Sequence, residues 1–579
     1  MKGFLKMTLA VFLGLNLFLT VPFFFLLYLI NSSSSELETK ISSNSVFYLE
    51  LSGELKERSD EDIFSLTEGM IDSQSEFLGL DDILSAIKIA KENENIKGIY
   101  LECGDFTAAP ASIQEIRDAL LDFKQTGKFI VSYADFYTQN TYFLASVSDK
   151  VFLNPLGALE LKGVSLQNVF YKNLLDKIGV EVQVVKVGTF KSAIEPYIQT
   201  EMSDANRAQL TQLSSSIWNQ IATTIASARN VKKECINEFV AHGLMLADAE
   251  ETINYGLVDS LVYKNEVKSY LKTLMESDYE SYSLKNILSS RLNNDFQQDK
   301  IAVVYAVGAI DNISSGEKGI DSKEISKKLL DIAEDKNIRA LVLRVNSPGG
   351  SAFGSEQIWK AMTEIKKNKP VIVSMGDYAA SGGYYISCIA DTIVAQPSTL
   401  TGSIGIFGLV PNVEKLLDNI GITTDVVKTH DLSDFGTVCR PMSMAEKTLM
   451  QKNVDRGYEL FVKRCAEGRK MSIRKLNEIA EGRVWSGIDA QKNGLVDVLG
   501  GLDDAIDFAA QKANVKDYQI VEYPKKKDIF TLLLEDFYNS GVQFSLGKMS
   551  REMNFLEMLE NLNEADKIQA LMPFDIVMN

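Results

Sequence analysis

One serine lies in a stretch of very small residues and is the first candidate for chemistry. In GDYAASGGYY, residues 376–385, Ser381 follows two alanines and precedes Gly382 and Gly383. A serine hydroxyl attacks an acyl carbon when a base within hydrogen-bond reach removes its proton. The small neighbours would leave room for an extended substrate backbone, so the stretch indicates acyl transfer with Ser381 as the nucleophile.

The base for this serine is less obvious, because the chain has only two histidines. His242 falls in a predicted helical segment and His430 in an irregular stretch, and either could serve. Lys191, in VGTFKSAIEPY, is the alternative. Burial among the apolar residues of that stretch would lower the pKa of its amine, and the neutral amine could then accept the proton of Ser381.

Acyl chemistry also needs N–H donors for the charge that develops on the carbonyl oxygen. NSPGGS (346–351) follows a predicted strand, and Gly349 or Gly350, together with Gly382, can offer backbone N–H groups without an obstructing Cβ. The GxSxG pattern of α/β-hydrolases is only approximated, since Ala379 stands at its first glycine. GGSAFG matches neither of the glycine patterns that bind nucleotide phosphates.

The chain contains two copies of one sequence. Adding 242 to residue numbers in the first half returns the same letters, as in Asp135 and Asp377, and within 174–188 eight of the fifteen positions match. Each copy alternates β-branched runs with amphipathic segments, such as IRALVLRVN (338–346), SEQIWKAMTEIKKNK (355–369) and VIVSM (371–375). The pattern predicts tandem α/β repeats with largely parallel strands.

The two copies differ at the candidate chemical groups. Gln139 occupies the position of Ser381 in the first copy, and Ser433 occupies the position of Lys191 in the second. Lys186, in contrast, has a lysine mate, Lys428. Shared residues of a duplicated chain mostly maintain the scaffold, so we expect the second copy to supply the serine and the first copy to supply the lysine.

We expect four parts in the chain: an anchor and tether (1–40), the first repeat (41–297), the second repeat (298–525) and a helical appendage (526–579). Residues 7–30 carry no charge and are long enough to cross a bilayer as a helix. Lys2 and Lys6 precede this run, whereas Glu36 and Glu38 follow it. The positive-inside tendency therefore places the N-terminus in the cytoplasm and the rest of the protein outside.

Composition narrows the classes of partner. The chain has 78 acidic and 60 basic residues, a net charge of −18, which argues against a nucleic-acid partner. The cysteines form no CxxC pair and no cluster with histidine, so we expect neither a metal site nor a disulfide framework, and no cofactor. They are expected to be buried thiols: Cys103, Cys235, Cys388, Cys439 and Cys465.

Several stretches together resemble the signal peptide peptidase A (protease IV) family in its long, duplicated form. They are VNSPGGSAFGSEQIW, GDYAASGGYYISC, TGSIGIFG, GTFKSAIEPY and GRVWSGIDAQKNGLVD, and the likeness covers about residues 45–525. The resemblance implies two tandem Clp/crotonase-like repeats after an N-terminal transmembrane helix. It also implies a serine peptidase in which Ser381 is the nucleophile, Lys191 the base and Ser403, from TGSIG, the residue that orients the lysine.

The same resemblance sets expectations for the biology. It implies a homotetramer anchored by residues 7–30 in the lipid of the bacterial inner membrane, with its catalytic part on the extracytoplasmic side, that degrades cleaved signal peptides. A crotonase-type enzyme acting on acyl thioesters with carboxylates, or a non-catalytic membrane scaffold, are the alternatives. The sequence leaves open whether the lysine and the serine meet within one chain or between chains.

Overall fold

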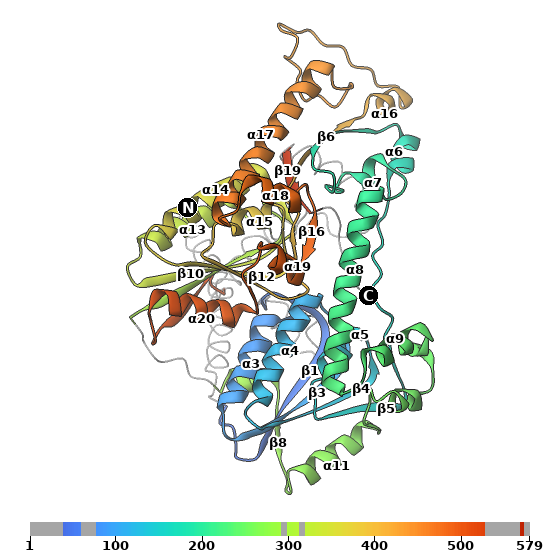
Figure 1. Cartoon of the computed structure of the whole chain (residues 1–579), viewed down its shortest axis with the longest axis vertical. Helices are drawn as coiled ribbons and strands as arrows, with labels where there is room; N and C mark the ends of the chain where they lie inside the picture. The colour runs from blue at the N-terminus through green and yellow to red at the C-terminus, as the bar shows by residue number, and fades with distance from the viewer. Residues whose placement is uncertain (1–38, 60–76, 291–297, 312–318, 527–567, 573–579) are drawn as a thin grey trace, which may run out of the picture.

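The computed structural model describes residues 39–59, 77–290, 298–311, 319–526 and 568–572. Within these ranges the chain forms two α/β units arranged along the long axis of the molecule (Figure 1). The expected anchor at 7–30 lies outside the described residues. In the part of the chain that is described, no helix combines the length and the apolar character needed to cross a membrane.

The first unit is built on a parallel sheet in the order β2-β1-β3-β4-β5-β7, with β8 also paired to β1. Its core consists of two hydrophobic clusters formed by this sheet and the helices that pack against it. Its strands are β1 (Ser45–Lys56), β2 (Phe77–Gly79), β3 (Ile96–Thr107), β4 (Phe129–Tyr137), β5 (Lys150–Leu159), β7 (Ser260–Leu261) and β8 (Glu280–Tyr282). Its helices are α3 (Leu80–Glu92), α4 (Pro110–Lys124), α5 (Gln139–Ala145), α6 (Lys172–Ile178), α7 (Glu195–Ile198), α8 (Asp204–Arg229), α9 (Lys233–Ala241), α10 (Ala249–Asn254), α11 (Lys264–Leu274) and α12 (Leu284–Leu288).

The second unit repeats this plan with the order β16-β14-β12-β10-β9-β18, in which only the β14–β16 pair is antiparallel. Strand β13 pairs with β12 and β17. The strands are β9 (Lys300–Val307), β10 (Ile338–Ser347), β12 (Val371–Ala380), β13 (Thr392–Ala395), β14 (Leu400–Gly402), β16 (Val484–Ser486), β17 (Val498–Leu499) and β18 (Gln519–Tyr523). The helices are α13 (Ser322–Glu334), α14 (Ala352–Lys366), α15 (Gly382–Ser387), α16 (Glu414–Asn419), α17 (Met444–Gly468), α18 (Ile473–Ile479), α19 (Gly487–Asn493) and α20 (Leu502–Ala513).

Matching side chains make matching bonds in the two units. The hydroxyl of Tyr142 donates to the Leu257 carbonyl at 2.6 Å, and that of its mate Tyr384 donates to Leu495 at 3.0 Å. Because both residues are buried and both partners lie in a GLVD segment, this bond ties the helix after the central strand to the same turn in each unit. The expected α/β repeats are confirmed, and Tyr384 belongs to the scaffold.

A third, smaller sheet joins the two units, in the order β11-β19-β15-β6. Strand β6 (Glu181–Val187) leaves the first unit and pairs antiparallel with β15 (Ile406–Asn412) of the second along its whole length. Strand β19 (Ile568–Leu571) lies between β15 and β11 (Gly349–Ser351). Residues 526–579 were expected to be helical, and this is wrong for the four residues of β19; residues 527–567 are not described.

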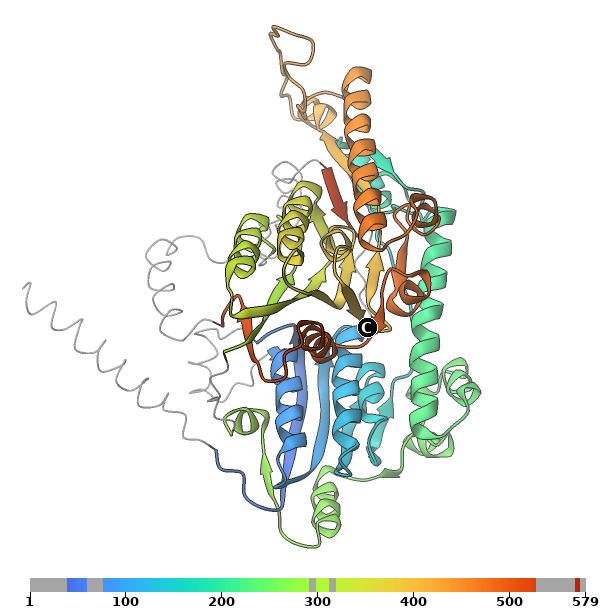
Figure 2. The same cartoon turned by 60° about the vertical axis from the view of Figure 1, so that its left-hand side comes forward.

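Helix α8 is the second element that bridges the units. It runs along the side of both (Figures 1 and 2), with Leu213 and Ile217 in the core cluster of the first unit. Its Ser216 hydroxyl lies 3.0 Å from that of Ser486 in the second unit. Residues 188–203, which lie between β6 and α8, are therefore held at both ends against the second unit.

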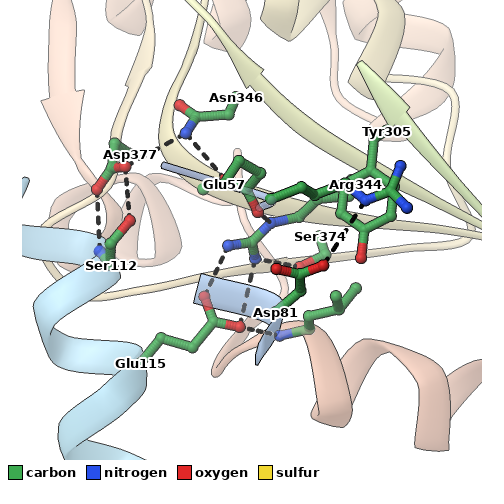
Figure 3. Close-up of polar contacts among 12 residues, drawn as sticks. Glu57, Asp81, Ser112, Glu115, Tyr305, Arg344, Asn346, Ser374 and Asp377 are labelled. Carbon is green, nitrogen blue, oxygen red and sulfur yellow. Dashed lines mark hydrogen bonds and ion pairs between the residues drawn. The ribbon is translucent and has the colours of Figure 1, made fainter. Parts of the chain in front are cut away.

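A buried network of charged and polar groups locks the units together (Figure 3). The Arg344 guanidinium of β10 donates to Glu57 at 2.6 Å and to Glu115 of α4 at 2.7 Å. Asp377 of β12 accepts from the backbone N–H and the hydroxyl of Ser112 at 2.9 and 2.7 Å. Burial alone would lower the pKa of Arg344, but the two carboxylates outweigh it and raise that pKa, so the guanidinium stays charged.

Candidate active site

Ser381 lies at the tight turn between β12 and α15. Its backbone has φ +55° and ψ −112°, a region that non-glycine residues rarely occupy and that costs about 1–3 kcal/mol. Hydrogen bonds hold this conformation: Ser381 N–H donates to Gly402 of β14 at 2.8 Å, and Tyr385 N–H donates to the Ser381 carbonyl at 2.8 Å. The strained turn presents the hydroxyl at the carboxyl end of the central strand.

Lys191 meets this serine from the other unit. Its Nζ donates to Ser381 Oγ at 2.8 Å, to Ser403 Oγ at 3.0 Å and to the Ser403 carbonyl at 3.2 Å. All three side chains are fully buried. The lysine and the serine come from one chain, because strand β6 crosses to β15 and directs the following loop at the second unit.

Burial lowers the pKa of Lys191 well below its ordinary value, because desolvation penalises the ammonium form. The amine has hydroxyl and carbonyl groups as its hydrogen-bond partners, and none of them is a carboxylate that would favour the charged form. An uncharged amine at this place can accept a proton from Ser381. The divergence of the two repeats at Lys191 was the sequence signal that separated it from Lys186, which is exposed on β6.

The loop that carries Lys191 is positioned by the first turns of α8. Gln209, which is buried, donates to the Phe190 carbonyl at 3.1 Å and to Ser192 Oγ at 3.2 Å, and it accepts from Val484 N–H of β16 at 3.3 Å. The amide thus ties the loop to both units at once. Sequence analysis missed Gln209. The signal that could have found it is a polar amide at a position of the helical pattern where apolar residues are expected.

Glycine makes the close approach around the lysine possible. A Cβ at Gly482 would lie 2.6 Å from the Lys191 Cβ, and one at Gly405 would lie 3.3 Å from the Lys191 Cδ. Gly482 also has φ +80°, which side chains with a Cβ adopt at a cost. The lysine stem therefore passes through a channel that only glycine leaves open.

The three glycines expected to stabilise an oxyanion, Gly349, Gly350 and Gly382, lie close together. Gly349 N–H donates to Ser347 Oγ at 3.2 Å and is therefore engaged. A Cβ at Gly349 would lie 2.8 Å from the nitrogen of Gly382, so the two segments converge at this point. Gly350 is paired with Ala570 of strand β19 and bridges to Ile310. Gly349 must lack a side chain, because a Cβ there would also collide with the Ala570 carbonyl oxygen.

The other sequence candidates lie elsewhere. His242 and His430 are exposed, and their rings lie near Tyr255 and Thr429 rather than Ser381. Cys103, Cys388 and Cys465 are buried as expected, whereas Cys235 and Cys439 are only partly buried; all five are free thiols. Among the described residues, no group of histidine, cysteine and acidic side chains is arranged to hold a metal ion.

A serine hydroxyl hydrogen-bonded to a buried amine, where glycine segments from two loops converge, is the arrangement of a serine protease that uses lysine in place of histidine. Comparison with known proteins agrees with that class. The model of peptidase family S49 matches residues 122–278 and 363–516, one range in each repeat, and the model of Clp protease matches residues 304–398.

Relatives extend over nearly the whole chain. Protease 4 of Haemophilus influenzae is 32% identical and covers 94% of this chain and 93% of its own length. Protease 4 of Salmonella typhi is 36% identical over 80% of this chain, and the chloroplastic serine protease SPPA of Arabidopsis thaliana is 31% identical over 83%. The chain belongs to peptidase family S49, in the long form with two family domains, and is a serine protease.

Proposed function

We propose that Ser381 is the nucleophile and Lys191 the general base of this protease. The observation that carries the proposal is the 2.8 Å hydrogen bond between Lys191 Nζ and Ser381 Oγ inside a fully buried site. The neutral amine takes the hydroxyl proton as Oγ attacks the carbonyl carbon of a substrate. The resulting ammonium then protonates the leaving amine, and a water molecule hydrolyses the acyl-enzyme by the same steps in reverse.

Three further groups have defined parts in this chemistry. Ser403 Oγ lies 3.0 Å from the lysine amine and directs it toward Ser381. The N–H groups of Gly350 and Gly382 stabilise the negative charge on the carbonyl oxygen. Because they are backbone donors of a strand and of a helix start, they need little reorganisation during the reaction.

We propose cleaved signal peptides as the substrates. The uncharged run at 7–30 would anchor the protein in the inner membrane, with Lys2 and Lys6 on the cytoplasmic side and both repeats on the extracytoplasmic side. Signal peptides that remain in that membrane after cleavage would then reach the site as flexible, apolar chains. An extended peptide that takes the place of β19 can pair with β11 and β15 through backbone hydrogen bonds, which are tolerant of sequence.

The unpaired counterparts of β6 and β15 support a homo-oligomer. Residues 423–429 correspond to β6 and residues 164–170 to β15 at the offset of 242, yet neither segment forms a strand within the chain. Val426 and Val427 are 53% and 100% exposed, and Val169 is 56% exposed. Residues 423–429 of one copy can therefore pair with 164–170 of the next, which is a head-to-tail contact of the kind from which closed rings are built.

We propose that this ring is the homotetramer. Val427→Asp should reduce the assembly to monomers on size-exclusion chromatography with light scattering. Leu246→Asp, at an apolar residue that is 83% exposed elsewhere, is the matched control and should leave the assembly intact. An unchanged mass for Val427→Asp would rule out this interface.

The catalytic assignment is tested with a fluorogenic signal-peptide sequence and the full-length enzyme in detergent. Ser381→Ala and Lys191→Ala should each lose about 10⁴-fold or more in kcat while the circular dichroism spectrum is unchanged. Lys186→Ala, at an exposed lysine on β6 five residues before Lys191, is the control and should retain activity. Near-normal turnover by either dyad variant would refute the assignment, and thioester hydrolysis that survives Ser381→Ala would favour crotonase-type chemistry.

A further inference from the structure

The helix that begins after Ser381 contains a tyrosine that fixes its first turn. Tyr385 N–H donates to the Ser381 carbonyl at 2.8 Å, so this residue closes the turn that holds the strained serine backbone. The Tyr385 side chain is buried, and its ring packs on that of Phe461 of α17, with 4.5 Å between the ring centroids. The position of the tyrosine ring therefore bears directly on the position of the serine.

The hydroxyl of Tyr385 is bonded to a carboxylate of the neighbouring helix α14. It donates to Glu356 Oε2 at 2.6 Å, which is the length of a bond to a charged acceptor. Arg464 of α17 donates to the other carboxylate oxygen at 2.6 Å, and its guanidinium lies 3.7 Å from the centre of the Trp359 ring. Burial and the bond to the carboxylate raise the pKa of Tyr385, so the hydroxyl keeps its proton and remains the donor.

Helix α14 begins directly after the loop that carries the candidate oxyanion glycines. Gly349–Ser351 immediately precede the first residue of this helix. A Cβ at Gly382 would lie 2.7 Å from Ser355 Oγ, so the first turns of α14 and α15 are in contact. The bond between Tyr385 and Glu356 joins the same two helices close to this contact. The distance from the serine to the glycine loop is therefore set by how α14 and α15 are held together.

The first repeat lacks this link between the two helices. At the offset of 242, Phe143 stands at the position of Tyr385, and Gln114 stands at that of Glu356. The phenylalanine has no hydroxyl to donate, and the Gln114 amide donates to Asp118 of its own helix at 2.8 Å. The hydroxyl and the carboxylate thus occur together only in the repeat that also contains the candidate nucleophile.

We propose that Tyr385 and Glu356 are positioning residues for the reaction, and that their hydrogen bond sets the spacing between Ser381 Oγ and the oxyanion donors. This rests on the roles proposed for Ser381, Gly350 and Gly382. The nucleophile precedes α15 and the glycine loop precedes α14, so a shift between these helices changes both the attack geometry and the stabilisation of the developing charge. Because that spacing matters most in the transition state, its loss lowers kcat rather than raising KM.

Steady-state hydrolysis of a fluorogenic peptide by the full-length enzyme in detergent tests this role. Tyr385→Phe keeps the ring on Phe461 and removes only the hydroxyl, so kcat should fall about ten- to a hundredfold with little change in KM. Tyr142→Phe is the matched control, because it removes a buried hydroxyl of the first repeat that donates to the Leu257 carbonyl. It should keep kcat near normal, and similar kcat values for the two variants would overturn the positioning role.

Variants of Glu356 show whether the bond itself is responsible. Glu356→Gln should be near normal, because an amide can still bond to the Tyr385 hydroxyl and accept from Arg464. Glu356→Leu should be as slow as Tyr385→Phe, and the double variant should be no slower than either, because all three lack the same bond. Losses that multiply in the double variant, or a Glu356→Gln enzyme as slow as Glu356→Leu, would overturn the proposal.

Ser381→Ala, assayed beside these variants, separates this proposal from the catalytic one. If Ser381→Ala is inactive while Tyr385→Phe has normal kcat, the positioning role is wrong and the catalytic role of the serine stands. If Ser381→Ala retains near-normal turnover, both are wrong. The result expected is an inactive Ser381→Ala, a slow Tyr385→Phe with unchanged KM, and a near-normal Tyr142→Phe.

Discussion

Lys191 and Ser381 are 190 residues apart in the chain and belong to different repeats, yet their functional groups lie 2.8 Å apart. Neither repeat alone contains both groups, since Gln139 and Ser433 stand at the equivalent positions. The proposed catalytic pair thus depends on how the two repeats pack. Strand β6, helix α8 and the network around Arg344 are the elements that fix this packing.

The first prediction concerns the pH dependence of kcat/KM. Desolvation lowers the pKa of Lys191, and only the neutral amine can accept a proton, so kcat/KM should rise with pH and level off well below the ordinary pKa of lysine. Lys191→Arg should be inactive at every pH, because a guanidinium keeps its proton. A profile that rises only near pH 10 would contradict the buried neutral base.

The second prediction concerns stability. Between the lowered pKa of Lys191 and about 10.4, the ordinary value, the unfolded chain binds a proton at this amine that the folded chain does not. The free energy of unfolding of Ser381→Ala should therefore rise with pH in this window, with a slope that approaches ~1.4 kcal/mol per pH unit. Below the lowered pKa of Lys191, the folded and the unfolded chain both carry the proton. The folded chain then bears the full cost of burying the ammonium group, so the unfolding free energy no longer changes with pH through this residue.

Lys191→Met in the same Ser381→Ala background removes this contribution. It should be more stable than its parent at neutral pH, and the difference should shrink toward pH 10. Urea unfolding at several pH values measures both curves, with Ser381→Ala used so that proteolysis does not intervene. Parallel curves for the two proteins would mean that burial does not shift the protonation of Lys191.

The third prediction assigns a positioning role to Gln209. Gln209→Leu removes the hydrogen bonds to the Phe190 carbonyl, Ser192 Oγ and Val484 N–H, so Lys191 loses its fixed distance to Ser381. We expect kcat to fall about ten- to a hundredfold with little change in KM. Gln220→Leu, later on the same helix, should be near normal. Equal losses for both variants would indicate a general effect on α8.

The fourth prediction concerns the interface between the repeats. Glu115→Ala leaves the buried Arg344 with Glu57 as its remaining carboxylate partner and removes the acceptor of Leu502 N–H, so we expect a loss of about 3–5 kcal/mol in unfolding free energy. Glu364→Ala breaks surface pairs with Lys360 and Lys367, which solvent screens, and should lower the unfolding free energy far less. Similar small losses for both would show that the network adds little.

Sequence comparison of the repeats led to the serine, the lysine and the strand–helix–strand units, because those signals are local or recur at a fixed offset. It could not show that β6 pairs with β15, since pairing between repeats leaves no local period. Arg344 and Glu115 each stand in a segment whose pattern is mostly apolar, which indicates that their charged side chains are buried. The pattern does not indicate that the two residues contact each other. Strand β19 carried no motif, because a backbone-paired segment requires little of its sequence.

Co-expression of two inactive chains tests the central claim, that one chain supplies both Lys191 and Ser381. Lys191→Ala and Ser381→Ala chains with different tags are purified through both tags, so that only mixed assemblies remain. If the pair forms within a chain, each chain lacks one group, and the mixed assembly should hydrolyse the fluorogenic peptide no faster than either variant alone. Recovery of a substantial fraction of wild-type activity would contradict the account, because the two groups would then meet between chains.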